Sequence, residues 1–279
     1  MDVPSLPPRD EASHKGTYGR VLIVGGSRGM AGSVALTGMA AARGGAGLVT
    51  LAVPDQCLET VACYDPCFMT MGLADDGDGR LSSEATSQLI GLMGRYTNIG
   101  IGPGLSQSED ITEVVTQVYQ QFIGTMVVDA DALNALATCP TGLSGAGGPR
   151  ILTPHVGEFR RLVGSELDPS ACRERAVELA REHQVIVVVK GHRSLVTDGQ
   201  TTFENETGNP GMATGGSGDV LTGVITALLG QGLSPLDAAA LGVHVHGLAG
   251  DLACDEVGEV SLIATDILEY LPEAFQALT

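Results

Sequence analysis

The residues best suited to chemistry lie in a glycine-rich segment, residues 209–219, which reads NPGMATGGSGD. Residues 214–218 of this segment open an apolar helical pattern that continues to residue 229. The start of a helix presents unpaired N–H groups and the positive end of the helix dipole, so it suits an anion such as a phosphate. Asp219 stands in this first turn. Asp219 is either only a favourable N-terminal charge or a base that takes a proton from a substrate hydroxyl during phosphoryl transfer.

Several other segments carry small and polar residues directly after an apolar run. Gly104 lies in IGIGPGL, Asp131 and Asn134 lie in VVDADALNAL, and His155 lies in ILTPHVGEF. The segment KGHRS consists of Lys190, Gly191, His192, Arg193 and Ser194. Ligands of open α/β sheets bind beyond the carboxyl ends of the strands, so we expect these segments to surround a ligand.

The histidines differ in what their positions indicate. His155 stands between Pro154 and Gly157 at the end of an apolar run, where loops carry function, so we expect it to bind a ligand. His244 and His246 are two positions apart in an expected helix and therefore point in different directions. We expect these two to fill the core or the surface rather than to bind a metal.

Two cofactor motifs are absent or incomplete. The pattern G-x-x-x-x-G-K does not occur, so a bound nucleotide would depend on the glycine turn, a metal ion and Lys190. Residues 25–29 resemble the dinucleotide turn of short-chain dehydrogenases, which also need a Tyr-x-x-x-Lys pair. Ile186 stands four positions before Lys190, and no tyrosine stands four positions before Lys15. Hydride transfer of that kind is therefore disfavoured.

Short apolar runs alternate with helix-length segments along most of the chain. The runs predict strands at residues 20–25, 47–53, 97–101, 125–129, 150–153 and 185–190. The intervening segments predict helices at residues 33–43, 82–95, 108–121 and 169–183, and a hairpin (194–198, 201–205) and three helices (217–229, 235–253, 263–271) follow. Most runs are continuously apolar, which is typical of strands covered on both faces. We therefore expect an α/β fold, a mostly parallel sheet with helices on both faces.

Composition limits the classes of function. The 279 residues are 43% hydrophobic, and no long linker divides them, so we expect a single domain over residues 1–279 with its core at about 14–270. The net charge of −18 would repel nucleic acid and anionic membranes, so neither is an expected partner. No apolar run approaches the roughly 18 residues of a membrane span. The first sixteen residues lack the apolar segment of a secretory signal and the six cysteines form no CxxC pair, so we expect a cytoplasmic protein.

Taken together, these segments resemble the NAD(P)H-hydrate dehydratase family of the ribokinase-like superfamily. The matching stretches are HKGTYGRVLIVGGS, RGGAGLVTLAV, IGIGPGL, VVDADALNAL, ILTPHVGEFRRL, VVVKG and NPGMATGGSGDVLTG. They run in order from about residue 14 to about residue 270. The resemblance implies a ribokinase-like fold. The two lysines of the chain, Lys15 and Lys190, both fall inside these motifs, as retention for a role would require.

The resemblance also implies a repair reaction. Its substrate is NADH or NADPH to which water has been added across the C5–C6 bond of the nicotinamide ring. A nucleotide phosphorylates the resulting hydroxyl, phosphate is eliminated with help from the lone pair of the ring nitrogen, and the reduced coenzyme is restored. Mg²⁺ is the implied cofactor and ADP, or ATP, the implied co-substrate. We expect ADP, and we assign no protein ligand to the metal.

Site residues are carried over motif by motif. Asp219 would be the base that removes the hydroxyl proton. The residues that would hold the hydrated coenzyme are Gly104, Asp131, Asn134, His155 and Asp219. The residues that would hold the nucleotide are Lys190, Gly191, His192, Arg193, Ser194, Gly215, Gly216 and Gly218. The bulky His192 and Arg193 depart from the family pattern and bear on the pocket for the base.

The expected partners follow from the same resemblance. Many family members are fused to an epimerase that interconverts the two hydrate epimers; because this chain begins almost at HKG, we expect the epimerase to be a separate protein or absent. We expect a homo-oligomer such as a tetramer, and the apolar segments 238–252 and 263–271 either contact another subunit or belong to the core.

Two alternative functions stay open. One is a small-molecule kinase of the same fold, of the hydroxyethylthiazole or hydroxymethylpyrimidine kinase type, and the other is a catalytically silent nucleotide sensor. The choice between NADH-hydrate and NADPH-hydrate is also open.

Overall fold

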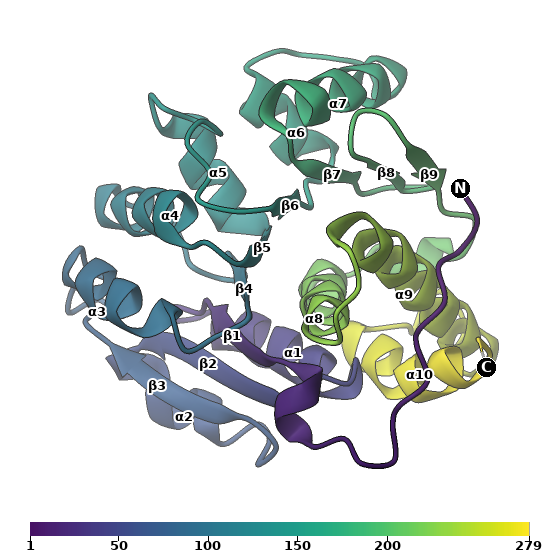
Figure 1. The fold of residues 1–279 in the computed structure, drawn as a ribbon, viewed down its shortest axis with the longest axis horizontal. Coiled ribbons are helices and arrows are strands. Elements are labelled where there is room, and N and C mark those ends of the chain that lie inside the picture. Colours follow the sequence, from purple (N-terminus) through teal and green to yellow (C-terminus); the bar gives the residue numbers. More distant parts are fainter. Residues whose placement is uncertain (279) are drawn as a thin grey trace.

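A nine-stranded sheet runs through the middle of the molecule (Figure 1). The computed structural model describes residues 1–278, and the strand order is β3-β2-β1-β4-β5-β6-β7-β8-β9. Strands β1 to β7 pair in parallel, and β8 and β9 add an antiparallel edge. The bounds are β1 Arg20–Val24, β2 Leu48–Pro54, β3 Met69–Leu73, β4 Asn98–Ile101, β5 Thr125–Val128, β6 Arg150–Leu152, β7 Ile186–Val189, β8 Leu195–Thr197 and β9 Thr202–Glu204.

Helices cover both faces of this sheet, as the continuous apolar strands predict (Figure 1). One layer contains α3 Glu84–Met93, α4 Glu109–Gln121, α5 Ala130–Thr138, α6 Val156–Val163 and α7 Pro169–His183. The other contains α1 Ala31–Arg43, α8 Ser217–Gly230, α9 Pro235–Val257 and α10 Ala264–Gln276, with the short α2 Leu58–Ala62 beside α1. Three short 3₁₀ helices complete the chain: η1 Lys15–Tyr18, η2 Asp55–Cys57 and η3 Pro210–Met212. Within residues 1–278, no helix combines the length and the apolar character that crossing a bilayer requires.

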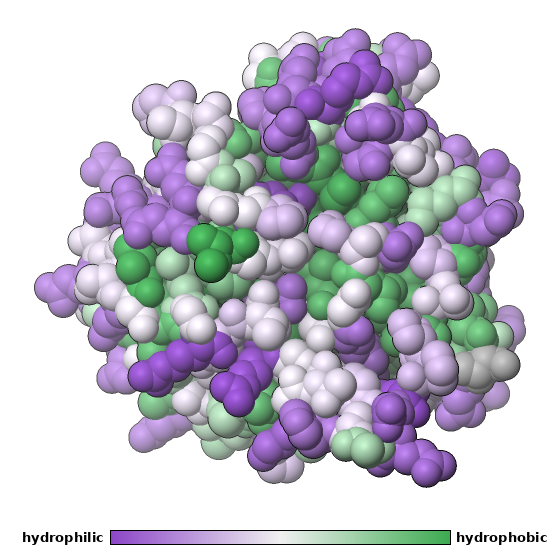
Figure 2. All heavy atoms as spheres, viewed as in Figure 1, coloured by the Kyte–Doolittle hydropathy of each residue, from purple (hydrophilic) through white to green (hydrophobic). Residues whose placement is uncertain are grey.

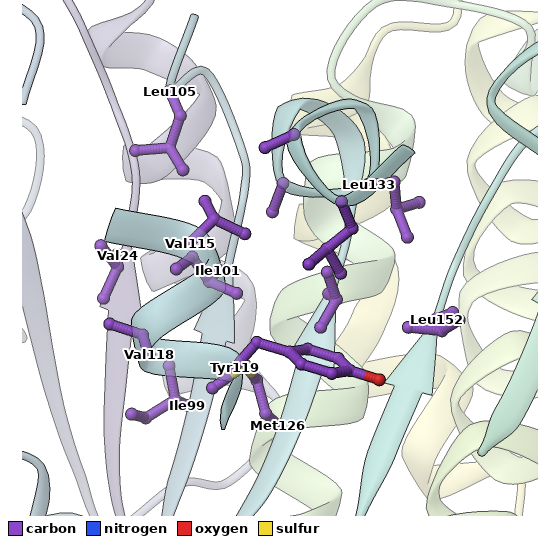
Figure 3. Packing of buried hydrophobic residues seen from close by; sticks show 14 of the residues in the cluster. Val24, Ile99, Ile101, Leu105, Val115, Val118, Tyr119, Met126, Leu133 and Leu152 are labelled. Carbon is purple, nitrogen blue, oxygen red and sulfur yellow. The ribbon is translucent and has the colours of Figure 1, made fainter. Parts of the chain in front are cut away.

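Each layer has its own apolar core. Figure 3 shows the core between the sheet and α4 and α5, where Ile99 and Ile101 of β4 lie against Val115 and Tyr119 of α4. The buried hydroxyl of Tyr119 donates to the backbone carbonyl of Leu143 at 3.0 Å. The polar end of this core side chain therefore has a partner, as burial requires.

The core of the opposite layer includes the two apolar C-terminal segments, residues 238–252 and 263–271. Helices α9 and α10 pack on each other and on α8, and most of their apolar side chains are buried there, among them Leu241, Ile267 and Leu271. These segments therefore belong to the core of a single chain. Hydrophilic side chains make up most of the outline of the face in Figure 2, in keeping with the net charge of −18, while apolar ones gather near its centre.

The strand order reverses between β1 and β4, which lie side by side although two strands separate them in the chain. The turn after β1 contacts the turn after β4 because the N–H of Gly26 donates to the carbonyl of Pro103 at 2.8 Å. A Cβ on Gly25 would stand only 2.4 Å from the same oxygen, so this approach requires glycine. Such a switch point is where open α/β sheets bind ligands.

The elements expected from the sequence are present, within a few residues of the predicted limits. Besides the three 3₁₀ helices, four elements were not predicted: β3, α2, α5 and α6. Three of these follow directly from a strand or a turn with little or no connecting loop, so no change of composition marks where they begin. The fourth, β3, has the sequence MTMGL, in which only Leu73 is buried.

Candidate active site

A cavity of about 820 Å³ opens between the segments that follow β7 and β9 and the start of α8. Met212, Leu221 and Val243 give it an apolar wall, and Asn205, Thr207 and Asn209 give it polar groups. A volume of this size suits a ligand such as a nucleotide. The predicted site residues that line the cavity are His155, Lys190, Gly191, His192, Arg193, Ser194 and Gly218.

The remaining predicted residues lie next to this cavity rather than in its wall. Gly215 and Gly216 belong to the turn between Thr214 and Ser217, both of which line it. Gly104, Asp131, Asn134 and Asp219 form a second group of contacts at the start of α1, α5 and α8, described below. The predicted site residues therefore fall into two adjoining groups, one on the cavity and one beside it.

The turn before α8 owes its shape to glycine. Gly216 is the residue that precedes the helix, and its φ of 93° is in the left-handed region. A Cβ at this position would also stand 2.7 Å from Cδ1 of Leu36 and 2.9 Å from the Cβ of Ala264. No side chain caps α8, so N–H groups of its first turn stay available beside the cavity. This arrangement suits the phosphate groups of a nucleotide.

Lys190 borders the cavity, but its ammonium group is already paired. Nζ lies 2.6 Å from Oδ1 of Asp129 and 3.8 Å from Oε2 of Glu158, and the side chain is 18% exposed. Burial lowers the pKa of Lys190, but the two carboxylates outweigh it and leave the pKa above its ordinary value. Lys190 is therefore a charged residue with two anionic partners of its own.

Asp219 has an unusual electrostatic environment. Its pKa is raised to about 6, first because the carboxyl is buried and then because the carboxylates of Asp129 and Asp131 repel its charge. A hydrogen bond from Ser33 and the charge of Lys190 act in the opposite direction. A carboxylate with a pKa near the working pH is well suited to remove a proton.

Gly104, in the turn at the switch point, also lies close to Asp219. A Cβ on Gly104 would lie 3.0 Å from the Cβ of Ser33, the residue whose side chain bonds Asp219. The φ of Gly104 is 66°, so both the close approach and the backbone favour glycine. The turn after β4 thus lies one side chain away from Asp219.

Asp131 and Asn134 are joined in a short chain of hydrogen bonds. The N–H of Ser106 donates to Oδ2 of Asp131 at 2.8 Å, and Nδ2 of Asn134 lies 3.5 Å from Oδ1 of Asp131. Nη1 of Arg161 donates in turn to Oδ1 of Asn134. These contacts fix the polar groups of the start of α5 beside the turn after β4.

His155 caps helix α6. Its Nδ1 accepts the N–H groups of Gly157 and Glu158 at 3.0 and 3.3 Å, so Nδ1 carries no proton and Nε2 does. Nε2 lies 3.3 Å from Oε1 of Glu158, and 53% of the side chain is exposed. The imidazole is thus held in one orientation at the edge of the cavity.

Several residues of the site were not predicted. Asp129 begins the DADALN motif but was not singled out, and Thr222 looked like an ordinary position of an apolar helix. His246 was expected to fill the core or the surface. It is buried, but it also lines the cavity, and its Nε2 lies 2.9 Å from the carbonyl of Ser217. Nothing in the sequence marks Asn205, Thr207 or Asn209 as cavity residues beyond the motif that begins at 209.

Lys15 lies elsewhere. It belongs to η1, which directly precedes β1, and a Cβ on Gly47 at the start of β2 would collide with the Lys15 carbonyl. Because β1 begins at η1 and ends at the turn that includes Gly25 and Gly26, Lys15 is at the opposite edge of the sheet from the cavity. Within one chain, the HKG motif therefore lies away from the candidate cavity.

Comparison with known proteins decides the family. A family model described as NAD(P)H-hydrate dehydratase matches residues 21–273. This chain belongs to the NAD(P)H-hydrate dehydratase family. The expected family and the ribokinase-like fold are thereby confirmed.

Individual relatives agree with this assignment. The bifunctional NAD(P)H-hydrate repair enzyme of Moorella thermoacetica is 45% identical over 98% of this chain and 52% of that protein. The corresponding enzyme of Thermofilum pendens is 37% identical over 98% of this chain and 53% of that protein. The chain thus spans about half the length of the curated relatives it matches.

Solved structures give the same result. The ADP/ATP-dependent NAD(P)H-hydrate dehydratase of Bacillus subtilis, co-crystallised with ATP/Mg²⁺, has a TM-score of 0.83 and 32% identity, covering 98% of this chain and 95% of that one. A hydroxyethylthiazole kinase of Pyrococcus horikoshii reaches a TM-score of 0.58 at 16% identity, with 86% and 91% covered. The second likeness shows the fold alone.

Proposed function

We propose that this protein restores hydrated NADH and NADPH to the reduced coenzymes in a reaction that consumes a nucleotide, ADP or ATP. One observation carries the proposal. Asp219, whose pKa is raised to about 6, stands in the uncapped first turn of α8, next to a cavity of about 820 Å³. A base and an anion-binding turn are thus adjacent, as transfer of a phosphoryl group to a hydroxyl requires.

In the proposed reaction Asp219 takes the proton of the C6 hydroxyl, and the oxygen forms a bond to the terminal phosphorus of the nucleotide. The bond from that phosphorus to the bridging oxygen breaks, and its electron pair leaves with the shortened nucleotide. N–H groups at the start of α8 stabilise the charge on the phosphoryl oxygens. The phosphate then leaves with the C6–O electron pair, helped by the lone pair of the ring nitrogen, and C5 loses a proton. The products are the reduced coenzyme, inorganic phosphate and the nucleotide shortened by one phosphate.

We assign the two adjoining groups of residues to the two ligands. The nucleotide would occupy the cavity, held by Lys190, Gly191, His192, Arg193, Ser194, Gly215, Gly216 and Gly218. The hydrated coenzyme would lie over the switch point, held by Gly104, Asp131, Asn134, His155 and Asp219. The position of His155 on the cavity edge supports a place between the two ligands.

Magnesium would come with the nucleotide. Residues 1–278 contain no group of three histidine, cysteine or carboxylate side chains arranged to hold a metal ion. Asp129 and Glu158, two buried carboxylates beside the cavity residue Lys190, face its ammonium group. The donors that fit Mg²⁺ best are therefore the phosphate oxygens of the nucleotide, and the ion would supply charge neutralisation there.

Four further expectations belong to the proposal. Residues 1–279 would act as one dehydratase domain with its core at about 14–270, which the continuous sheet from Arg20 to Glu204 supports. A cytoplasmic location is supported by the six cysteines, all of which are free thiols. The protein would form a homo-oligomer, for which the exposed apolar side chains Val257, Val260 and Ile263 offer a contact surface. An NAD(P)H-hydrate epimerase would act on the same substrate.

Phosphorus NMR separates this function from a small-molecule kinase. The protein is incubated with hydrated NADH, Mg²⁺ and ADP, and with hydroxyethylthiazole in a parallel sample. The proposal predicts inorganic phosphate and AMP with hydrated NADH and no phosphate ester with the thiazole. A stable phosphate ester of either alcohol would favour the kinase.

A further inference from the structure

Asp129 is a buried carboxylate that the proposed reaction does not use. It follows β5 directly and is 1% exposed. Its Oδ1 accepts from Nζ of Lys190 at 2.6 Å, and its Oδ2 accepts from Oγ1 of Thr222 at 2.8 Å. One carboxylate therefore joins the end of β5 to the segment after β7 and to α8.

This junction lies against the catalytic turn. A Cβ on Gly218 would stand 3.2 Å from Nζ of Lys190 and 3.8 Å from Oδ2 of Asp129, so the backbone that carries Asp219 passes beside the pair. Thr222 is one helical turn beyond Gly218 on the same face of α8. The first turn of α8 is thus held from both sides of Asp219.

Resting on the proposed function, we propose that Asp129 is a positioning residue for Asp219: through Thr222 it fixes the first turn of α8, and through its ion pair it keeps the ammonium group of Lys190 beside its own carboxylate. Lys190 has only one positive charge, and Asp129 and Glu158 are its nearest carboxylates. In the free protein Lys190 therefore pairs with a carboxylate that is almost fully buried.

The other groups around Asp219 set the direction of the effect. Asp131 of α5 repels its charge, Ser33 of α1 donates a hydrogen bond to it, and Lys190 attracts it. His246 of α9 stands beside Ser217, and burial lowers its pKa to about 4, so it is neutral at working pH. Among the charges that face Asp219, Asp129 has the largest effect, and it favours a protonated Asp219 at pH values where an exposed aspartate is ionised.

The test is the variant Asp129→Asn, which keeps the shape of the side chain and removes its charge. The acid limb of the pH profile of kcat/KM reports the pKa of the base in the free enzyme. We expect this limb, near pH 6 in the wild type, to move down by about one pH unit or more, because a carboxylate is lost and a cation is released toward Asp219. Carbon NMR of the labelled Asp219 carboxyl should show the same downward shift.

The single variant leaves Lys190 without its nearest partner, which could impair folding. The double variant Asp129→Asn, Lys190→Met removes both charges of the buried pair, so no unpaired charge remains. Its acid limb should lie between those of the wild type and Asp129→Asn. The variant Thr222→Val removes a hydrogen bond without altering charge, so it should lower kcat and leave the limb in place. An unmoved limb in the first two variants would overturn the inference. Absence of activity in the wild type would contradict the proposed function but not this inference, because the NMR titration would still measure the pKa of Asp219.

Discussion

Nε2 of His246, on α9, lies 2.9 Å from the backbone carbonyl of Ser217, the first residue of α8. The imidazole is buried, which lowers its pKa to about 4, so it is neutral and its Nε2–H is the donor. A side chain from a neighbouring helix therefore holds the turn that is proposed to bind phosphate. His246 also lines the cavity, so it connects the packing of α9 to the geometry of that turn.

We expect His246→Ala to raise the KM for ADP and to lower kcat, with kcat/KM falling by about tenfold or more, because the turn loses its support. Steady-state kinetics with ADP varied would measure this. His244→Ala is the matched control, two positions earlier on α9, and should change kcat/KM by less than about twofold. Equal losses in both variants would show that α9 as a whole, not the contact with Ser217, is responsible.

The raised pKa of Asp219 predicts a cost in stability. The carboxyl titrates near pH 6 when folded and near 3.8 when unfolded, so the folded state binds the extra proton between these values. Stability is therefore lost as pH rises from about 4 to 6, at a rate of up to about 1.4 kcal/mol per pH unit, and the loss is complete above that range. Asp219→Asn should stabilise the protein, and by more at pH 8 than at pH 5.

Thermal unfolding of wild type and Asp219→Asn at the two pH values would show this difference. The exposed Glu113, in α4, provides a control, since Glu113→Gln should give the same small effect at both. A stabilisation of Asp219→Asn that does not grow with pH would contradict the raised pKa.

Arg150 predicts a purely structural effect. It is 1% exposed, and its guanidinium donates to the carbonyls of Tyr119, Phe122 and Gly124 at the end of α4, at distances from 2.5 to 3.2 Å. Arg150→Met would remove the guanidinium donors from these carbonyls, leaving that of Tyr119 with only the N–H of Gly147, and should cost about 3 kcal/mol or more of unfolding free energy. Denaturation by urea would measure it, with the exposed Arg95→Met expected to stay within about 0.5 kcal/mol.

Gly218 predicts an effect on activity without loss of the fold. An added Cβ would stand 3.2 Å from Nζ of Lys190, which is tethered to Asp129. Gly218→Ala should therefore displace the lysine or the turn and lower kcat/KM by about tenfold or more. Gly91→Ala, in α3, is the control because its Cβ would contact nothing within 4 Å; it should leave activity unchanged. Full activity of Gly218→Ala would show that activity does not depend on the close approach of Gly218 to Lys190.

The sequence predicts which segments lie at the ligand-binding edge of the sheet, but it does not predict contacts between residues far apart in the chain. Parallel strands place their carboxyl ends at one edge, so KGHRS, TPHVGE and the turn before α8 could be brought together from sequence patterns alone. The bond from Thr222 to Asp129 joins residues 93 positions apart and has no local signal. The pairing of Lys190 with Asp129 and the position of His246 are of the same kind. Such contacts depend on how α8 and α9 pack, which the patterns do not specify.

The central claim is that Asp219 and the first turn of α8 carry out nucleotide-dependent repair of the nicotinamide ring. The most direct measurement is absorbance at about 340 nm after the protein and Mg²⁺ are added to hydrated NADH with ADP, with ATP or without nucleotide. The account predicts a rise that requires a nucleotide and that Asp219→Asn abolishes while ADP binding stays within a few-fold of wild type. A nucleotide-dependent rise that persists in Asp219→Asn, or no rise with either nucleotide from folded wild-type protein, would contradict it.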